Sequence, residues 1–363
     1  MSAVLSPVPS TFTDLTDVRE RFAAARHSGL RAKDAAEQLD LSEGAAIAAH
    51  VAADGALQAT RLRSAWLEIL QGLQACGPVM ALTRNATVVH EKTGVYRNVS
   101  GQGPMGIALD ADIDLRLFFR HWHAGFAVQE AAAQPGSLPQ QSLQFFNAQG
   151  VAVHKVFVRD ATDRAAWNAL VERFADAAAE PAAFGPAPAP KAPLPDAEVD
   201  AVALAADWAA MQDTHDFFGL LQKHQAERQQ SLRLVEGRFA RRLERRAVRV
   251  LLDEAAMDAT PIMVFVGSVG CIQIHSGPVQ RVEPMVRGDV HWLNVLDPHF
   301  NLHLREDRID TVWVVEKPTA DGTVTSVEVF DATGELMAMF FGVRKPGQPE
   351  LQAWRDLVGR LPR

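Results

Sequence analysis

The histidine in the segment "DTHDFFGL" (213–220) is the residue best placed to do chemistry. Trp208 and Phe218 recur around His215 at helical spacing, which predicts a helix over 208–222 with the imidazole on its apolar face. That position is typical of a buried structural histidine. A neutral imidazole on an apolar face is also the axial ligand that haem iron accepts. A porphyrin needs apolar walls and cations for its carboxylates as well, so these features must be sought elsewhere in the chain.

The other histidines do not form a metal-ligand pattern. His121 and His123 are predicted on one side of an alternating strand, without a nearby carboxylate. His299 and His303 could share a metal only on a helix, whereas "DPHFNLHLRED" is predicted to be extended. The chain also lacks HExxH, G-x-S-x-G and P-loop motifs, which excludes the commonest zinc protease, hydrolase and NTPase sites.

Two segments raise the alternative of a DNA-binding regulator or scaffold. Residues 30–51 resemble a helix-turn-helix, with Ser42 as the N-cap of the second helix. That helix, "SEGAAIAAHV", carries no Arg, Lys, Asn or Gln to read base edges, so two short packed helices are favoured. The arginine-dense segment 227–254 is predicted to be a solvated helix face, with Glu236 and Glu244 as ion-pair partners.

Composition favours a cytoplasmic protein. The formal charge of −8 over 363 residues argues against nucleic-acid binding. Cys76 and Cys271 are far apart and lack CxxC spacing, which fits a reduced compartment. No secretory signal is evident, and the apolar run at 261–274 is too short for a membrane span, so we expect no stable membrane insertion.

An Ala/Pro-rich segment, "ADAAAEPAAFGPAPAPKAPLPD", lies near the middle of the chain. It cannot continue a helix and is predicted to supply no core, so we interpret it as a semi-rigid tether. The predicted organisation is an N-terminal repeat over 1–175, a linker over 176–196, and a C-terminal repeat over 197–363.

Four blocks of the two halves match in order, at a spacing of 183–187 residues. They are "TVVHEKTGVYRNV" with "GCIQIHSGPVQRV", "IDLRLFFRHWHAGFAV" with "FNLHLREDRIDTVWVV", "SLQFFNAQG" with "SVEVFDATG", and "AAWNALVERF" with "QAWRDLVGRL". The blocks predict short strands, hairpin turns at "NAQG" and "DATG", and a closing amphipathic helix. We therefore predict an α+β fold of two tandem, structurally similar repeats, each with helices and an antiparallel β-sheet, and a haem cleft between layers.

These segments resemble the bacterial hemin-degrading factors (HemS/HmuS-like), cytoplasmic proteins that accompany haem ABC importers. The resemblance covers nearly the whole chain. It is carried by "VYRNVSGQGPMGIALDADIDLRLFF", "DTHDFF", "IMVFVGSVGCIQIHSG", "WLNVLDPHFNLHL", "WVVEKPTADGTVTSVEVFD" and "FFGVRKPGQPE". Six motifs in the same order make the match specific.

The resemblance implies roles on the two faces of a haem. His215 is implied as the axial iron ligand, and Arg116 as the residue that reaches the opposite face. An arginine does not ligate iron, but its donors hold water, hydroxide or dioxygen bound there. The alternative for Arg116 is an ion pair with Asp112 or Asp114 at the strand edge.

The resemblance also implies the walls and the rim of the site. It assigns Arg228 as a propionate partner on the helical segment of His215, Phe265 as a wall, and Lys317, Phe341 and Arg344 around the haem edge. Phe341 stands where relatives often carry tyrosine, and Glu316 where they commonly carry arginine, so the chain departs from the family pattern at both positions.

The expected function is a haem-binding protein that receives imported haem and either passes it on or degrades it to release iron. The implied partners are a haem importer and a downstream haem acceptor or reductase. Ring opening requires an external electron donor, with Arg116 as the candidate catalytic residue. The sequence leaves carrier and enzyme open.

Overall fold

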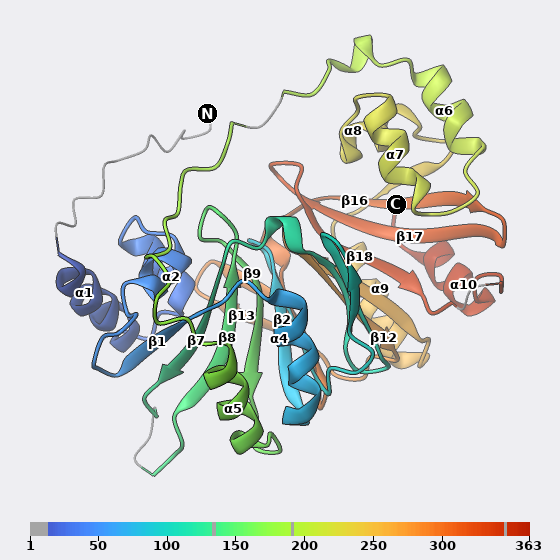
Figure 1. The fold of residues 1–363 in the computed structure, drawn as a ribbon. Helices are drawn as coiled ribbons and strands as arrows, with labels where there is room; N and C mark the ends of the chain where they lie inside the picture. Colours follow the sequence, from blue (N-terminus) through green and yellow to red (C-terminus); the bar gives the residue numbers. More distant parts are fainter. Residues whose placement is uncertain (1–13, 133–135, 190–191, 345–346) are drawn as a thin grey trace. The chain divides into compact units, whose positions relative to one another are not determined.

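A computed structural model describes residues 14–132, 136–189, 192–344 and 347–363 (Figure 1). The start of the predicted N-terminal repeat (1–13), two linker residues (190–191) and part of the motif "FFGVRKPGQPE" (345–346) lie outside the described residues. The chain forms two compact units. Unit 1 contains the chain up to Thr83, Thr93–Ala189 and Ser268–Ile272, and unit 2 contains Arg84–Lys92, Pro190–Gly267 and Gln273–Arg363. Because each unit includes a short segment from the other half of the chain, the boundaries 1–175, 176–196 and 197–363 stay a prediction.

Unit 1 is built on antiparallel strands. They are β1 (Leu57–Leu62), β2 (Val79–Arg84), β4 (Ser100–Gln102), β5 (Met105–Leu109), β6 (Asp114–Phe118), β7 (Ala124–Glu130), β8 (Gln140–Phe146) and β9 (Ala152–Val158). Hydrogen-bonded neighbours follow the orders β1-β7-β8-β9-β2 and β6-β5-β4.

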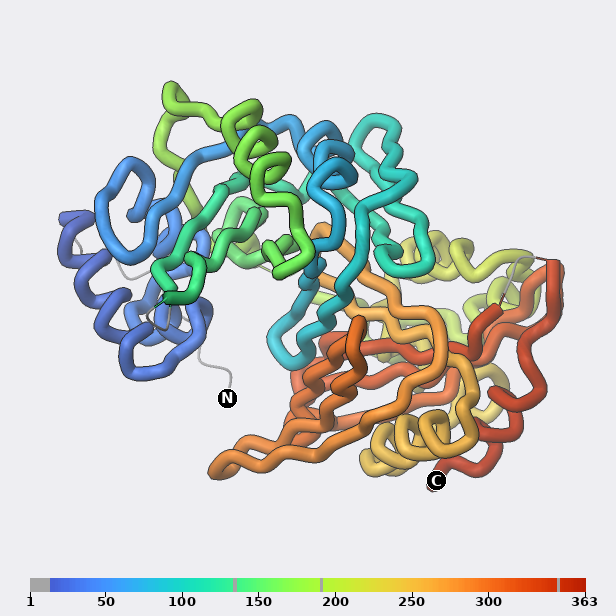
Figure 2. The backbone as a smooth tube through the Cα atoms, turned by 90° about the horizontal axis from the view of Figure 1, so that it is seen from below, coloured from blue at the N-terminus to red at the C-terminus, as the bar shows by residue number. Residues whose placement is uncertain are grey.

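Unit 2 repeats this arrangement. Its strands are β3 (Val88–Gly94), β10 (Ala240–Leu243), β11 (Ile262–Gly267), β12 (Cys271–Gly277), β13 (Val282–Arg287), β14 (Val290–Asp297), β15 (Phe300–Arg305), β16 (Ile309–Thr319), β17 (Gly322–Asp331) and β18 (Leu336–Gly342). The orders β10-β16-β17-β18-β11 and β15-β14-β13 equal those of unit 1 with nine added to every strand number. The β13–β14 hairpin extends from this unit (Figure 2, orange).

The strand registers confirm the internal repeat residue by residue. Phe126 pairs with Gln144 in unit 1, and Trp313 pairs with Glu328 in unit 2. The predicted alignment of Phe126 with Trp313 is therefore confirmed. The turns at "NAQG" and "DATG" join β8 to β9 and β17 to β18, and each ends on a glycine with positive φ (74° and 84°).

Helices flank these strands. In unit 1 they are α1 (Leu15–His27), α2 (Ala32–Gln38), α3 (Glu43–Ala48), α4 (Trp66–Gly72) and α5 (Arg164–Phe174). In unit 2 they are α6 (Ala201–Ala209), α7 (Asp216–Lys223), α8 (Arg228–Leu234), α9 (Ala247–Met257) and α10 (Gln352–Arg360). Short 3-10 helices cover Leu73–Cys76, Phe119–His121, Asp196–Glu198 and Glu306–Arg308. The fold class is confirmed as α+β with two similar units and antiparallel sheets.

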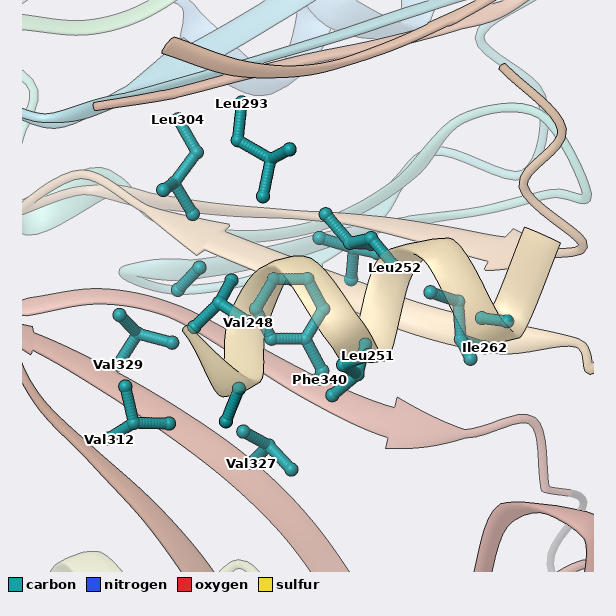
Figure 3. Close-up of a cluster of buried hydrophobic side chains, with 14 of the residues drawn as sticks. Val248, Leu251, Leu252, Ile262, Leu293, Leu304, Val312, Val327, Val329 and Phe340 are labelled. Atoms are coloured by element: carbon teal, nitrogen blue, oxygen red, sulfur yellow. The ribbon is translucent and has the colours of Figure 1, made fainter. Parts of the chain in front are cut away.

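In unit 2, helices pack on both faces of the sheet. Val248, Leu251 and Leu252 of α9 contribute to a core that includes Phe340 of β18 (Figure 3). Trp354 of α10 belongs to the same core. On the other face lie α6, α7 and α8 (Figure 1). Their side chains form a second core with side chains of β16 and β17. Strand side chains alternate between the two faces, so each strand serves both cores.

The Ala/Pro-rich segment contributes to packing, which corrects one prediction. Its described residues, 175–189 and 192–196, form no long helix, as expected, but Phe184 packs against a hydrophobic core of unit 1. The segment is held by backbone bonds as well, since the Gly185 N–H donates to the Ala148 carbonyl at 2.9 Å. Leu194 packs against a core of unit 2. The prediction that this segment supplies no core is therefore wrong.

Two predictions of local structure are also wrong. The helix expected over 208–222 is interrupted, because α6 ends at Ala209 and α7 begins at Asp216. His121 ends a 3-10 helix and His123 precedes β7, so these two histidines do not share a strand.

Candidate functional site

His215 lies at the N-terminus of α7, with 90% of its side chain exposed. The prediction of an apolar helix face is wrong because aspartate side chains bind the backbone here. Asp216 accepts hydrogen bonds from the N–H groups of Gln212 and Asp213, and Asp213 accepts one from the His215 N–H at 2.8 Å. Such side-chain-to-backbone bonds replace helical ones and begin a new helix.

The imidazole of His215 is oriented by Asp213. Its Nδ1 lies 2.5 Å from Asp213 Oδ1, so Nδ1 is the protonated nitrogen of the neutral ring. Among the described residues, Nε2 has no hydrogen-bond partner. The two hydrogen bonds from His215 lower the pKa of Asp213, and the positive charge of Arg344 lowers it further. Metal-binding histidines have this arrangement: one ring nitrogen donates to a carboxylate, and the other is free to bind the metal.

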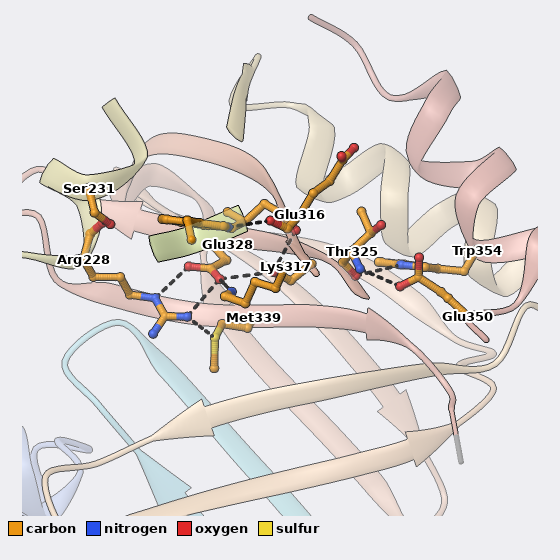
Figure 4. A network of polar contacts seen from close by, with 12 residues as sticks. Arg228, Ser231, Glu316, Lys317, Thr325, Glu328, Met339, Glu350 and Trp354 are labelled. Carbon is orange, nitrogen blue, oxygen red and sulfur yellow. Dashed lines mark hydrogen bonds and ion pairs between the residues drawn. The ribbon is translucent and has the colours of Figure 1, made fainter. Parts of the chain in front are cut away.

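A buried ion cluster joins α8 to the sheet of unit 2 (Figure 4). Glu328 is fully buried and accepts hydrogen bonds from Arg228 Nε at 2.7 Å, Arg228 Nη2 at 2.9 Å and Lys317 Nζ at 2.8 Å. Ser326 Oγ donates to the same carboxylate at 3.1 Å. Burial alone would raise the pKa of Glu328, but Arg228 and Lys317 hold it well below its usual range. The three charged side chains therefore carry one net positive charge.

Phe217 connects this ion cluster to the helix that follows His215. Its ring centroid lies 4.6 Å from Lys317 Nζ and 5.0 Å from Arg228 Cζ. The same ring packs against Trp208 of α6 at 4.8 Å. These contacts fix α7, and with it the backbone of His215, against the buried cations.

Half-buried apolar side chains line the neighbouring strands β11 and β18. Met263 pairs with Phe341, and Phe265 with Met339, so the four lie together on one face of the sheet. The rings of Phe265 and Phe341 are 4.9 Å apart. We call these four residues the apolar platform. Met339 Sδ lies 3.2 Å from Arg228 Nη2, so the platform borders the ion cluster.

Arg116 belongs to unit 1, on β6. Its side chain is about one-third exposed and forms an ion pair with Asp114, which is the alternative partner that the sequence offered. Burial raises the pKa of Asp114, and Arg116 opposes that shift. Leu115 and Leu117 point to the buried face of the same strand.

Unit 2 thus holds every predicted site residue except Arg116. His215, Arg228, Phe265, Lys317, Phe341 and Arg344 all lie in it. Arg228 begins α8 rather than sharing a helix with His215, and Lys317 is buried in the ion cluster, with 4% of its side chain exposed.

Sequence reasoning missed Asp213, Phe217, Glu328 and Met339. Glu328 could have been found from the sequence, because "SVEVF" reads as an apolar strand. Residues two apart share a face in a strand, so the carboxylate is expected on the same buried face as its neighbours two residues away. Met339 offered no signal, because its role follows from strand register rather than from local sequence.

The segments that suggested DNA binding have structural roles. Residues 30–51 form α2 and α3, and Ser42 caps α3 as expected. The first residue of α3, Glu43, is buried in an ion pair with Lys155. The arginine-dense segment is not one helix, because β10 separates α8 from α9. Several of its arginines pair with acidic side chains, such as Arg249 with Glu306.

None of the helices in the described ranges combines the length and the apolar character that a bilayer crossing requires.

Comparison with known proteins agrees with the resemblance. The family model described as the haemin-degrading HemS.ChuX domain matches residues 40–174 and again 225–361. The hemin transport protein HemS of Yersinia enterocolitica is 38% identical over 340 residues, which cover 93% of this chain and 95% of HemS. The structure is similar to that of holo-PhuS, a heme-binding protein from Pseudomonas aeruginosa, with a TM-score of 0.90, 46% identity, and coverage of 96% and 99% of the two chains. It is also similar to the heme degrading enzyme ChuS of Escherichia coli O157:H7, with a TM-score of 0.87, 35% identity, and coverage of 96% and 100%. The chain therefore belongs to the haemin-degrading HemS/ChuX-domain family.

Proposed function

We propose that this protein binds haem in unit 2 and either hands it on or degrades it. His215 Nε2 is the iron ligand, the apolar platform contacts the porphyrin, and Arg228, Lys317 and Arg344 supply positive charge for its carboxylates. The HemS, PhuS and ChuS relatives support this proposal, since their names describe hemin transport, heme binding and heme degradation.

The observation that carries the proposal is the exposure and hydrogen bonding of the His215 imidazole. The imidazole is exposed, its Nδ1–H is bound to Asp213, and Nε2 is left for a ligand. A structural histidine in the core would instead have both ring nitrogens hydrogen-bonded. The apolar platform, which borders the ion cluster at Arg228, carries half-buried aromatic and thioether groups that suit a flat apolar ring.

The remaining roles follow from the same proposal. Bound haem supplies an iron centre for redox chemistry. Arg116 is proposed as the catalytic residue, because its guanidinium can donate hydrogen bonds to an oxygen ligand. The protein is proposed to act in the cytoplasm, to receive haem from an importer, and to release it to an acceptor or reductase. Degradation would need an external electron donor.

Titration of the apoprotein with hemin, followed in the Soret band, tests the proposal. We expect saturable binding and a spectrum of histidine-ligated haem. A reductant is then added in air to the complex. Loss of the Soret band supports the degrading enzyme, and a stable spectrum supports the carrier. Absence of saturable binding would refute the proposed function altogether.

A further inference from the structure

Glu328 has no role in the proposal above, yet it is the centre of the ion cluster. Its carboxylate is fully buried and bonded to two of the three cations expected at the haem edge, Arg228 and Lys317. The charged groups that face it within the described residues are Arg228 from α8 and Lys317 from β16. Uncharged groups border the rest of the cluster: Phe217 from α7 contacts both cations, Met339 from β18 contacts Arg228, and Ser326 from β17 bonds the carboxylate.

Unit 1 shows that the fold does not require a carboxylate at this place. The equivalent of Glu328 is Gln144, because each pairs with the matched residue of the preceding strand, Trp313 or Phe126. Gln144 is also buried. The fold therefore accepts a neutral side chain of similar size at this position. We infer that the negative charge of Glu328 has a role beyond filling space in the core.

The charge balance of the two units differs as well. In unit 1 the first residue of α3, Glu43, pairs with Lys155, and the pair is neutral. In unit 2 the first residue of α8, Arg228, pairs with Glu328, and Lys317 adds one positive charge. The arrangement in unit 2 therefore offers one net positive charge to an anionic group.

Lys317 depends on Glu328 for its charge. Burial lowers the pKa of Lys317, and Glu328 opposes that shift, whereas the nearby Arg228 strengthens it. A lysine as buried as this one and left beside an arginine without a carboxylate would lose its proton readily. Glu328 also fixes the Lys317 ammonium group in space, through a 2.8 Å hydrogen bond.

We propose that Glu328 is a positioning residue for ligand carboxylates: it keeps Lys317 charged and in place beside Arg228, so that the pair attracts a propionate of haem. This inference rests on the proposed function. It predicts that removing the Glu328 charge makes haem binding sensitive to pH, because Lys317 then titrates within an accessible range.

The test compares wild type with Glu328→Gln, which gives unit 2 the residue that unit 1 carries. Glu335→Gln removes the same charge from an exposed position at the β17–β18 turn and is the matched control. Binding of hemin and of hemin dimethyl ester, whose carboxylates are blocked, is measured at pH 6, 7, 8 and 9. Circular dichroism checks that each variant is folded.

We expect Glu328→Gln to lose about tenfold in hemin affinity at pH 8, as the loss of one charge-assisted bond implies. The loss should shrink as the pH falls toward 6, because Lys317 regains its proton. Wild type and Glu335→Gln should show the same dependence of hemin affinity on pH. The dimethyl ester should bind to all three proteins with equal affinity.

Two results would overturn the inference while leaving the proposed function intact. One is an unchanged affinity and pH profile for hemin in Glu328→Gln. The other is an equal, pH-independent loss for hemin and its dimethyl ester, which would give Glu328 a structural role only. If wild type itself does not bind hemin, the proposed function fails and this inference fails with it.

Discussion

Replacing Arg228 by methionine should destabilise unit 2 even before any ligand is present. The change removes both hydrogen bonds that the guanidinium donates to Glu328, at 2.7 and 2.9 Å. Glu328 has no exposed surface, so the lost partner cannot be replaced by water. Breaking a buried ion pair typically costs 3–5 kcal/mol, and because Lys317 and Ser326 still bind the carboxylate, we expect about 3 kcal/mol.

Arg344→Met is the control, since Arg344 is also predicted at the haem edge but has no carboxylate bonded to it among the described residues. We expect its free energy of unfolding to stay within about 0.5 kcal/mol of wild type. Urea unfolding of the unliganded proteins, read by hydrogen exchange in peptides from β16–β18, separates unit 2 from unit 1.

A double-mutant cycle with Glu328→Gln isolates the interaction itself. The double variant should be more stable than the sum of the two single effects allows, by about 2 kcal/mol. Equal stability of Arg228→Met and Arg344→Met, or strict additivity in the cycle, would refute the reasoning that Arg228 is held by Glu328.

Three further outcomes follow. Lys155→Met should destabilise unit 1 by about 3 kcal/mol in thermal unfolding, because it breaks the ion pair with Glu43 where both side chains are less than one-tenth exposed. Burial lowers the pKa of His154 to about 3, so the folded state stays neutral while the unfolded imidazole gains a proton as the pH falls below about 6.5. The free energy of unfolding therefore falls on acidification. Between pH 6 and 4, His154→Gln should reduce this pH dependence by about 1.4 kcal/mol per pH unit, as measured by urea unfolding. Phe265→Ala should weaken hemin binding about tenfold by removing a ring of the apolar platform, as measured by fluorescence quenching.

The repeated architecture was predictable because its signals are local. Alternating strands, glycine-ended turns and a closing helix recur at nearly constant spacing, and the paired Trp167 and Trp354 lie on α5 and α10 as the alignment expects. Such features depend on periodicity within a few residues, which a sequence displays directly.

The environment of His215 was not predictable from periodicity. Trp208 and Phe218 matched one helical pattern, but they belong to two helices separated by a turn in which Asp213 and Asp216 bind the backbone. The result is an exposed imidazole instead of a buried one. Local side-chain bonds overrode the apolar pattern.

The ion cluster was hidden for a different reason. Lys317 was expected at the rim of the site but is buried. The register of β16 against β17 pairs Lys317 with Val324, and the long side chain of Lys317 reaches Glu328 further along β17, at 2.8 Å. Register between strands is set by the whole sheet, so an ion pair across it leaves no fixed spacing in the sequence.

The central claim is that His215 Nε2 ligates haem iron, and chemical rescue tests it most directly. Hemin is titrated into wild type, His215→Ala and the control His291→Ala, which removes an exposed histidine on β14. We predict that only His215→Ala loses affinity and shifts the Soret band, and that added free imidazole restores the wild-type spectrum. An identical spectrum and affinity in wild type and His215→Ala would contradict the account.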